Sequence, residues 1–456
     1  MKEFKKHTSL VNSYASQMRS SFATLNCDVN DQQIEELAIF LIRTMGSDLR
    51  DYHRPEHSLD VSKVESPVAR LAAFFHDLIY VQVDPTWRSL EQTLDPFIPD
   101  DLLTLNVKAS LKRNPDQWLR AIAVMFGVAG EPSLTPARGL NEFLSAIMMY
   151  RKLSLYLDPL AMFRAVACVI ATVPFLGIDA EGKNPAQRLV LRMKEAAAIL
   201  GFNDLNELFY EDLIEECCQI VSTDLASFGS IKLADYISNT WNVMYESYPP
   251  LRNMYFNVSD YRKAVFGNIS FLATLDSTRL YWNAYSAKAK APDPELYARS
   301  NYNLKLGQVY LKAVGVSLSV LEAIAHETGG DAPYEMFVGA MKRSREHHPV
   351  TIEYLLDVPS KIVGTSDEIA IFTILRDGRG SRARFDGKNA PLAAYLFLQL
   401  KTDGLLALFK HAESFHQGKI TAKAFLEFLP KTYLKAILKA LSETALTRVQ
   451  EIEKLI

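Results

Sequence analysis

The hydrophobic positions of this 456-residue chain recur mostly at helical spacing. The clearest stripe is formed by Ile34, Leu37, Leu41 and Met45, and it predicts a helix over residues 31–46. Further helices are expected over residues 67–80, 158–172, 184–200, 204–223, 230–247, 258–290 and 295–314. Before residue 360 no stretch alternates apolar and polar positions with the period of a strand. The first two-thirds of the chain is therefore expected to be all-α.

The last third favours helices over residues 334–345, 390–410 and 421–455. Residues Glu368–Leu375 (EIAIFTIL) differ, because they are β-branched and aromatic and lead into the turn-forming run RDGRGS and then RARF. This is a weak hairpin signal. We expect an all-α protein whose mainly helical C-terminal domain includes, at most, one small β-hairpin.

Chain length indicates two or three domains, and a 48% hydrophobic content is enough for sizeable cores. Residues 1–29 are polar and rich in Ser and Thr, so we expect a loosely packed lead-in with one short helix. We then expect a catalytic domain over residues 30–315 and, after Gly329-Gly330, a C-terminal domain over residues 330–456 whose role the sequence leaves open.

Charge and cysteine usage favour a cytoplasmic protein. The net charge of −3 gives no field that attracts nucleic acid or an anionic membrane. None of the four cysteines forms a CxxC pair, and the N-terminus has no apolar signal region. The most membrane-like run, Ala161–Ile178, is short and interrupted by Arg164 and Pro174, so we expect a buried core helix there.

The candidate chemistry is concentrated between Tyr52 and Tyr80. His53 and His57 are four residues apart, which places them on one face of a helix or helical turn. His76-Asp77 lies within an apolar run, and burying an imidazole with a carboxylate is costly unless they pair or bind a metal. The pattern predicts a metal site, and the alternative is a set of hydrogen-bonded polar residues in a core.

Mixed imidazole and carboxylate ligands suit Mn, Fe, Ni, Zn or Mg rather than a structural thiolate zinc site. A catalytic ion of this kind polarises a phosphoryl oxygen and lowers the pKa of bound water. A nearby histidine that is not a ligand can protonate the leaving oxygen. Two histidines one helical turn apart could divide these two roles.

The motif Tyr52-His53-xxx-His57-xx-Asp60-Val61, followed by His76-Asp77, resembles the HD superfamily of metal-dependent phosphohydrolases. The first part is also similar to the cyclic nucleotide phosphodiesterases of that superfamily. The likeness is closer to a group of predicted HD-domain phosphohydrolases, whose later Asp-Leu-Ala-x-x-Gly turn matches Asp224–Gly229. It continues through Tyr261-Arg262, Phe271-Leu272, Arg279–Tyr281 and Ala298–Asn301, and so covers roughly residues 30–310.

This resemblance implies an all-α HD-domain helical bundle. It implies that His57, His76, Asp77 and Asp224 are metal ligands, and that His53 and Asp77 take part in catalysis, with His53 as the acid for the leaving group. For Asp224 the rivals are Asp235 and a plain helix C-terminal turn. For His53 the rival role is a hydrogen bond to a metal ligand.

The sequence departs from the pattern in two places. The group usually has an acidic residue soon after His-Asp, and here neither Asp84 nor Glu91 fits cleanly. Glu91 could orient water or begin a solvated helix, and Arg88 could hold a phosphate, so both are candidate substrate-binding residues. Residues 95–160 are longer than the pattern expects, and we interpret them as a helical insert that forms a lid or selects the substrate.

Other polar groups favour simpler interpretations. The basic stretch of Arg376, Arg379, Arg382, Arg384 and Lys388 could grip a phosphate or a nucleic-acid backbone, but a solvated turn is favoured. His347-His348 and the pair His411 and His416 lack ligand spacing, and we expect them at the surface.

The sequence thus predicts a cytoplasmic metal-dependent phosphohydrolase that cleaves a phosphate ester or nucleotide with metal-activated water. Its expected partner is a small phosphorylated substrate, with no membrane role and no nucleic acid. The alternative is an HD core that binds a nucleotide without turnover, as a sensor or scaffold, with residues 330–456 carrying the output. Substrate, metal identity and oligomeric state stay open.

Overall fold

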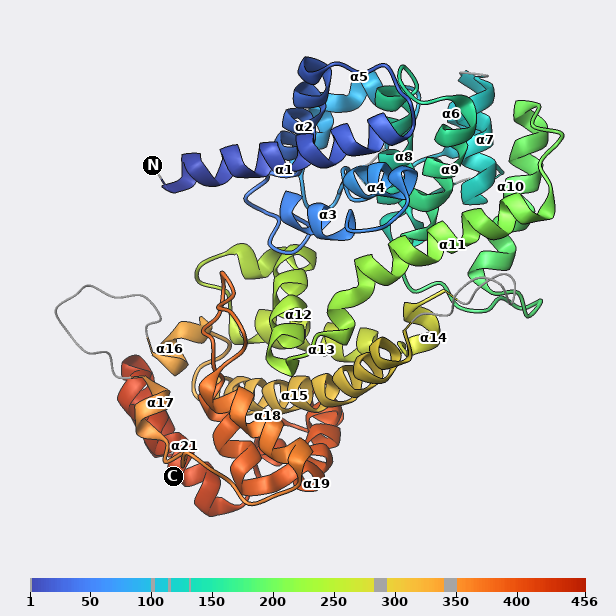
Figure 1. Cartoon of the computed structure of the whole chain (residues 1–456). Coiled ribbons are helices and arrows are strands. Elements are labelled where there is room, and N and C mark those ends of the chain that lie inside the picture. The colour runs from blue at the N-terminus through green and yellow to red at the C-terminus, as the bar shows by residue number, and fades with distance from the viewer. Residues whose placement is uncertain (1, 100–102, 114–115, 131–132, 283–292, 340–350) are drawn as a thin grey trace. The chain divides into compact units, whose positions relative to one another are not determined.

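The computed structural model describes residues 2–99, 103–113, 116–130, 133–282, 293–339 and 351–456 (Figure 1). Over these ranges it contains 22 α-helices and five short 3-10 helices, without any strand. Two isolated bridges, Leu105 with Leu134 and Asn257 with Pro333, are its only extended pairings there. The expectation of an all-α protein is confirmed.

The chain divides into two compact units, which we describe separately. Unit 1 comprises residues 1–226 and 276–298, and unit 2 comprises residues 227–275 and 299–456. The helices of unit 1 are α1 Lys2–Thr24, α2 Asp31–Met45, α3 Pro55–Val61, α4 Pro67–Phe75, η1 Pro85–Leu90, α5 Glu91–Leu94, α6 Val107–Arg113, α7 Gln117–Phe126, η2 Pro136–Arg138, α8 Leu140–Leu153, α9 Pro159–Ala171, α10 Pro185–Leu200, α11 Glu207–Asp224 and α14 Ser277–Leu280.

Unit 2 holds the remaining helices, apart from two that cross a boundary between the units. Those two are η3 Leu225–Gly229 and the start of α15 Pro294–Glu327. The others are α12 Leu233–Ser247, η4 Pro249–Arg252, α13 Val258–Leu272, α16 Tyr334–Val338, α17 Ile352–Leu355, α18 Ser366–Asp377, α19 Pro391–His416, α20 Ala422–Leu426, α21 Lys431–Thr444, η5 Leu446–Arg448 and α22 Val449–Glu453.

Helix α4 is the central element of unit 1, because it contacts α1, α3, α8, α9 and α11. It begins with Ser66, whose hydroxyl accepts from the backbone N–H of Ala69, followed by Pro67 in the first helical position. It ends at Phe75, earlier than residue 80. His76 forms its C-cap, and the Nδ1–H of His76 donates to the carbonyl of Ala73 at 2.8 Å.

A buried carboxylate ties α11 to α4 and α9. The hydroxyl of Ser66 donates to Glu216 at 2.7 Å, and the guanidinium of Arg164 donates to the same carboxylate at 2.6 and 3.1 Å. A two-point Arg–carboxylate contact fixes orientation as well as distance. The carbonyl of Leu225, just past the end of α11, accepts from the hydroxyl of Tyr281 at 3.3 Å. These bonds hold the C-terminal end of α11 in place.

The expected loosely packed lead-in with one short helix is wrong. The segment forms a single 23-residue helix, α1, in which Tyr14, Met18 and Phe22 are fully buried. The hydroxyl of Tyr14 bonds the carbonyl of Pro55 at 2.7 Å and also contacts the hydroxyl of Ser58. The polar residues of this segment form the outer face of an amphipathic helix, and its inner face supports α3.

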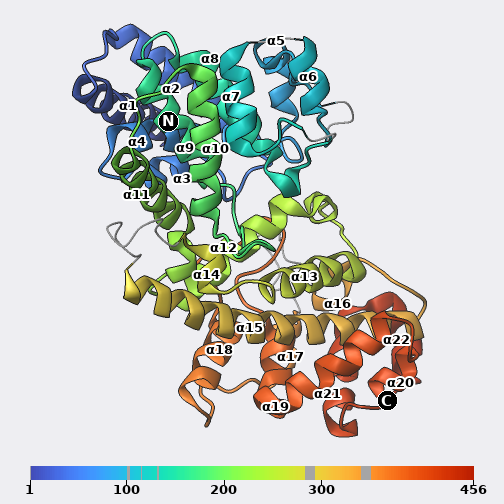
Figure 2. The ribbon, with the colours of Figure 1, turned by 90° about the vertical axis from the view of Figure 1, so that its right-hand side faces the viewer.

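In unit 2 the long helix α15 lies between α13 and the helices α18 and α19 (Figure 2). Gly315 of α15 allows close approach of α13, because a Cβ there would lie 3.1 Å from the ring of Phe266. Arg262 of α13 pairs with Glu322 of α15 through two contacts of 2.9 and 3.0 Å. The hydroxyl of Ser319 on α15 also bonds His416 of α19 at 2.8 Å.

The expected β-hairpin is wrong, because Glu368–Leu375 lies within α18. Thr365 and Glu368 form a reciprocal capping box at its start, a helix signal that outweighs the β-branched composition.

The prediction of one continuous helix over residues 258–290 is also wrong, as its described residues show. The helix ends at Leu272, and Asp276 caps the separate α14 by accepting from two backbone N–H groups, while residues 283–290 lie outside the described ranges.

Two described helices are long and apolar enough to cross a bilayer by length and composition. They are α15 and α19, with 83% and 50% of their most apolar window buried in the protein. Core helices pass the same test, so this is weak evidence for a membrane. The apolar run beginning at Ala161 forms the buried α9.

The structure corrects one of the remaining histidine expectations. His416 is not at the surface, since its side chain is 9% exposed and packs on Phe266 and Phe415. His347 and His348 lie outside the described residues.

Candidate metal centre

Four side chains of unit 1 converge from three separate parts of the chain. His57 lies on α3, His76 and Asp77 follow the end of α4, and Asp224 is the last residue of α11. One imidazole nitrogen or carboxylate oxygen from each lies within 4.8 Å of the others. These four residues, which we call the His/Asp cluster, could hold a metal ion.

The shortest contacts within the cluster run between imidazoles and carboxylates. The Nε2 of His57 lies 3.0 Å from the Oδ1 of Asp224 and 3.7 Å from the Oδ2 of Asp77. The Nε2 of His76 lies 2.8 Å from the same oxygen of Asp77 and 3.4 Å from the same oxygen of Asp224. Both imidazoles therefore direct one nitrogen toward the same two carboxylate oxygens.

The tautomer of His76 is fixed by its backbone contact. Because Nδ1–H donates to the carbonyl of Ala73, the neutral ring presents a lone pair at Nε2. That Nε2 is buried and has no hydrogen-bond partner of good geometry among the described residues, although Asp77 is close. A buried nitrogen lone pair that faces two carboxylate oxygens is the arrangement that a cation would satisfy.

The cluster is largely buried, and its charges are strongly coupled. The exposed fractions of the four side chains run from 1% for His76 to 19% for Asp77. Burial alone would raise the pKa of the Asp77 carboxyl, but His76, His53 and His57 hold that pKa well below its usual range. Burial would likewise lower the pKa of His76, but Asp77 and Asp224 raise it well above the usual value. A bound cation would take the place of the proton that these carboxylates stabilise.

The donor set fits a divalent ion. Two imidazole nitrogens and two carboxylate oxygens suit borderline to hard ions, as the sequence predicts, and contain no thiolate. Partial exposure of His57, Asp77 and Asp224 leaves an open side on which water or a substrate oxygen could complete the coordination.

His53 lies beside the cluster and not within it. It precedes α3, and its ring is perpendicular to that of His57, with centroids 5.8 Å apart. It also packs edge-on against Tyr52 and Tyr80. Its charge acts on Asp77, lowering the pKa of that carboxyl. The structure thus brings His53 next to the four predicted ligands.

A buried arginine organises the backbone around the site. Arg50 and Asp84 form an ion pair with side chains 0% and 1% exposed. The guanidinium of Arg50 also donates to the carbonyls of His53 at 3.0 Å, Asp77 at 2.7 Å and Leu78 at 3.0 Å. Asp84 therefore binds Arg50, and Arg50 holds the segment carrying His53 in register with the segment carrying Asp77.

Arg88 and Glu91 are placed differently from this group. They lie on η1 and at the start of α5, where they face each other at 3.9 Å with side chains 55% and 39% exposed. Glu91 does not belong to the group of four described residues that could hold a metal ion, and neither does Arg88. Their roles in binding substrate stay predictions.

Sequence reasoning missed Glu142, on α8 within the segment interpreted as an insert. Asn141 and Ser145 of the same helix accept the backbone N–H groups of Val81 and Ile79, so this face of α8 packs on the chain just after Asp77. Glu142 is 9% exposed, and its Oε2 is buried with no partner among the described residues. Burial, followed by the negative charges of Asp77 and Asp224, raises its pKa to about 8. The available signal was that Glu142 is the one acidic residue of helix α8.

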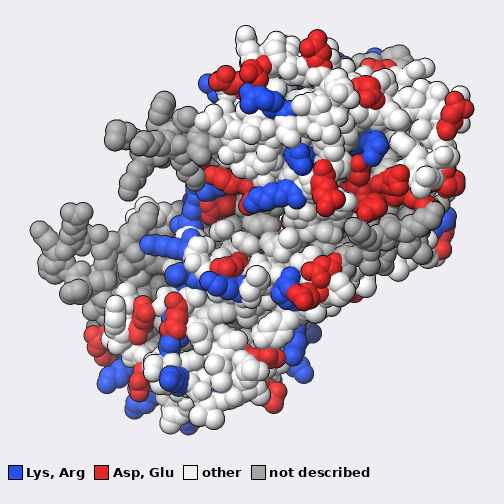
Figure 3. Space-filling model, in the orientation of Figure 1, with Lys and Arg blue, Asp and Glu red and all other residues white. Residues whose placement is uncertain are grey.

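The basic stretch of unit 2 is mostly neutralised or solvated. Arg376 pairs with Asp377 through two contacts of 2.6 Å, and Arg379 is buried against Asp386. The remaining members, Arg382, Arg384 and Lys388, are exposed. Figure 3 shows basic side chains gathered over this segment and acidic side chains gathered over α11.

Comparison of the chain with protein-family profiles, with curated proteins and with solved structures finds no match. The candidate metal site is therefore inferred from the geometry of the His/Asp cluster and its surroundings, without support from a related protein.

Proposed function

We propose that this protein is a metal-dependent phosphohydrolase that cleaves a phosphate ester or nucleotide, built on an HD-type helical core. The observation that carries the proposal is the convergence of His57, His76, Asp77 and Asp224 on one point, where the buried Nε2 of His76 finds no hydrogen-bond partner in the part of the chain that the structure describes. The same four residues are those that the HD-type motifs imply.

A divalent ion held by the four side chains would polarise a phosphoryl oxygen and lower the pKa of a water molecule beside it. Asp77 and Asp224 supply the negative charge that attracts the ion, and their depressed pKa values keep both carboxylates ionised at neutral pH. His76 is oriented through its bond to Ala73, so that Nε2 faces the two carboxylates.

His53 is the proposed acid for the leaving group. Its ring lies next to that of His57 and is held between Tyr52 and Tyr80, at the side of the cluster. An imidazole has a pKa near working pH, so it can give a proton to the departing oxygen and regain it from solvent. Arg50 keeps the backbone of His53 and Asp77 at a fixed separation by bonding both carbonyls.

The proposal extends to the protein's surroundings. We infer a small phosphorylated substrate and a cytoplasmic location, because the net charge of −3 favours neither nucleic acid nor an anionic membrane. Arg88 is the proposed phosphate-binding residue and Glu91 the proposed water-orienting carboxylate, since both are exposed near the chain segment that follows Asp77.

The test is a panel of phosphomonoesters, phosphodiesters and nucleotides, assayed with Mn, Mg, Zn, Ni or Fe in turn. We expect hydrolysis that depends on an added ion and is lost in Asp77→Ala. Asp60→Ala is the matched control, because Asp60 lies on α3 but pairs with Lys63 at the surface. No hydrolysis of any member with any ion would contradict the proposal, and stabilisation by a nucleotide without product would favour a sensor.

A further inference from the structure

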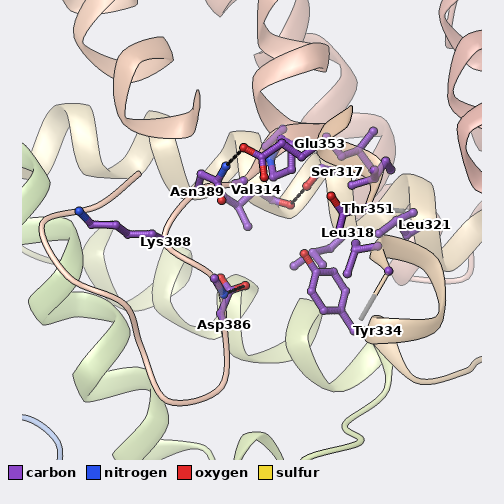
Figure 4. A pocket seen from close by; sticks show the side chains of 18 of the residues that line it. Val314, Ser317, Leu318, Leu321, Tyr334, Thr351, Glu353, Asp386, Lys388 and Asn389 are labelled. Atoms are coloured by element: carbon purple, nitrogen blue, oxygen red, sulfur yellow. Dashed lines mark hydrogen bonds between the residues drawn. The ribbon is translucent and has the colours of Figure 1, made fainter. Parts of the chain in front are cut away.

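Unit 2 contains a cavity of about 440 Å³ that is separate from the His/Asp cluster (Figure 4). Its walls come from α15, from Tyr261 of α13, from Tyr334, Val338 and Gly339, from residues 351–354, and from Arg382 and residues 386–393, which lead into α19. Volumes of this size are typical of sites for small organic molecules. All of these segments belong to unit 2.

One wall of the cavity is apolar. Val314, Leu318 and Leu321 follow one another at helical spacing on α15, so they share a face, and each is at most 3% exposed. Leu392 of α19 adds to the same lining. An apolar ring or chain placed against these side chains would be removed from water, which favours binding.

The lining of the cavity includes hydroxyl and N–H groups that can donate hydrogen bonds. The hydroxyl oxygen of Thr351 is buried without a partner, and the hydroxyl of Tyr334 points into the cavity (Figure 4). Helix α19 begins here without a side-chain cap, so the first-turn N–H groups of Leu392 and Ala393 are not satisfied by a side chain. Arg382 adds an exposed positive charge at the lining.

The acidic residues of the lining are already bound by the protein. Asp386 accepts from Tyr261, from Trp241 at 3.2 Å and from Arg379 at 3.2 Å, so its charge is neutralised. Glu353 accepts from the amide of Asn389 at 2.8 Å. Among the acidic residues of the lining, Asp386 is therefore neutralised within the protein, and one oxygen of Glu353 is occupied.

We propose that unit 2 binds a small organic carboxylate with an apolar, ring-sized body. The body would pack on the α15 face of Val314, Leu318 and Leu321, and the carboxylate would accept from the free donors of the lining. A single carboxylate is favoured over a phosphate because the ammonium of Lys388 points away from the cavity (Figure 4), which leaves Arg382 as the other cationic residue of the lining. The proposal does not depend on the metal centre.

The test uses three probes that share one ring and differ in charge: indole-3-acetate, 3-methylindole and tryptamine. Titration calorimetry on the full-length protein is expected to show binding in that order of decreasing affinity. Tighter binding of tryptamine than of indole-3-acetate, or no binding of indole-3-acetate at millimolar concentration, would overturn the proposal.

Two variants locate the site. Thr351→Val removes an unpartnered hydroxyl, so it should weaken indole-3-acetate binding about fivefold without lowering the melting temperature of the free protein. Arg382→Gln should weaken the same probe about threefold and leave 3-methylindole unchanged. Arg384→Gln is the matched control, since Arg384 is an exposed neighbour that packs on Tyr245 and is not part of the lining. Equal loss in Arg382→Gln and Arg384→Gln, or a lower melting temperature with unchanged affinity in Thr351→Val, would show that the carboxylate binds elsewhere.

Discussion

Each unit buries a group of charged side chains, and the two groups differ in how they are satisfied. In unit 2, Asp386 accepts from Trp241, Tyr261 and Arg379 through one oxygen and from the backbone N–H of Gly387 through the other. In unit 1, the oxygens of Asp77 and Asp224 face two imidazole nitrogens, and no described residue forms a hydrogen bond of good geometry with the Nε2 of His76.

This difference shows that burial of charge does not by itself mark a functional site. The charges of the group around Asp386 are balanced within the group, since Arg379 neutralises the carboxylate and also lies over the ring of Trp241 at 4.4 Å, although the Nε of Arg379 has no hydrogen-bond partner among the described residues. It is a structural ion pair of the kind that orders a core. The His/Asp cluster leaves the Nε2 of His76 without a hydrogen-bond partner among the described residues, and an added cation could satisfy it. The following predictions test that distinction.

The largest effect is expected from breaking the buried ion pair of Asp386 and Arg379 in unit 2. Asp386→Asn leaves the guanidinium of Arg379 buried without a counter-charge, which should lower the free energy of unfolding by about 3–5 kcal/mol. Urea unfolding measures this decrease in the free energy of unfolding. The control Asp377→Asn removes the charge of a half-exposed carboxylate, and it should lower the free energy of unfolding by about 0.5 kcal/mol or less. Similar losses in the two variants would contradict the structural role.

The stability of the folded His/Asp cluster should instead depend on a bound cation. A divalent ion present at about 100 times its dissociation constant should raise the free energy of unfolding by about 2.7 kcal/mol, because it binds only the folded chain. Urea unfolding with and without the ion measures this. The gain should vanish in His76→Ala and persist in Asp60→Ala. A gain of the same size in His76→Ala would mean that the ion binds elsewhere.

A third effect concerns His416 of unit 2. Burial, together with Arg262 and His326, lowers its pKa to about 3, although Glu322 lies 4.0 Å from its ring. Below the ordinary pKa near 6.5 the unfolded chain binds a proton that the folded chain does not, so stability falls as pH falls. Between pH 7.5 and 5 the loss should reach about 2 kcal/mol.

Urea unfolding of the wild type and of His416→Gln at those two pH values isolates this contribution. The variant should lose less stability than the wild type over the same interval. An equal loss in both proteins would mean that other groups carry the pH dependence.

The smallest effect concerns positioning in unit 1. Arg50→Lys cannot bond Asp84 and three carbonyls at once, since an ammonium lacks the planar fork of a guanidinium. The four ligands remain, so Mn affinity should fall about tenfold without being lost. Calorimetric titration of Mn into each protein measures this. Arg43→Lys, an exposed change on α2, should leave the affinity unchanged.

The sequence predicted the all-α fold because helical periodicity runs through most of the chain. It failed where two signals competed, as in Glu368–Leu375, where composition favoured a strand and the capping box of Thr365 and Glu368 decided for a helix. The polar lead-in was misjudged for a similar reason, because Tyr14, Met18 and Phe22 form a narrow buried stripe among polar residues.

The site was only partly accessible to sequence reasoning. His57, His76 and Asp77 lie close together in the chain at spacings that suggest a common face. Asp224 came from the HD-type resemblance alone, because nothing local distinguishes it from other helix-terminal carboxylates. Glu142 and Arg50 were missed because their importance depends on long-range packing, of α8 on the segment after Asp77 and of Asp84 on Arg50.

The most direct test of the central claim is the metal content of the purified full-length protein after incubation with Mn or Zn and dialysis. The wild type and Asp212→Ala, an exposed change on the same helix α11, should each retain at least about one equivalent. Asp224→Ala should retain none, because it removes the ligand contributed by the end of that helix. A wild type without metal, or an Asp224→Ala variant that retains the full amount, would contradict the claim that these four side chains form a cation site.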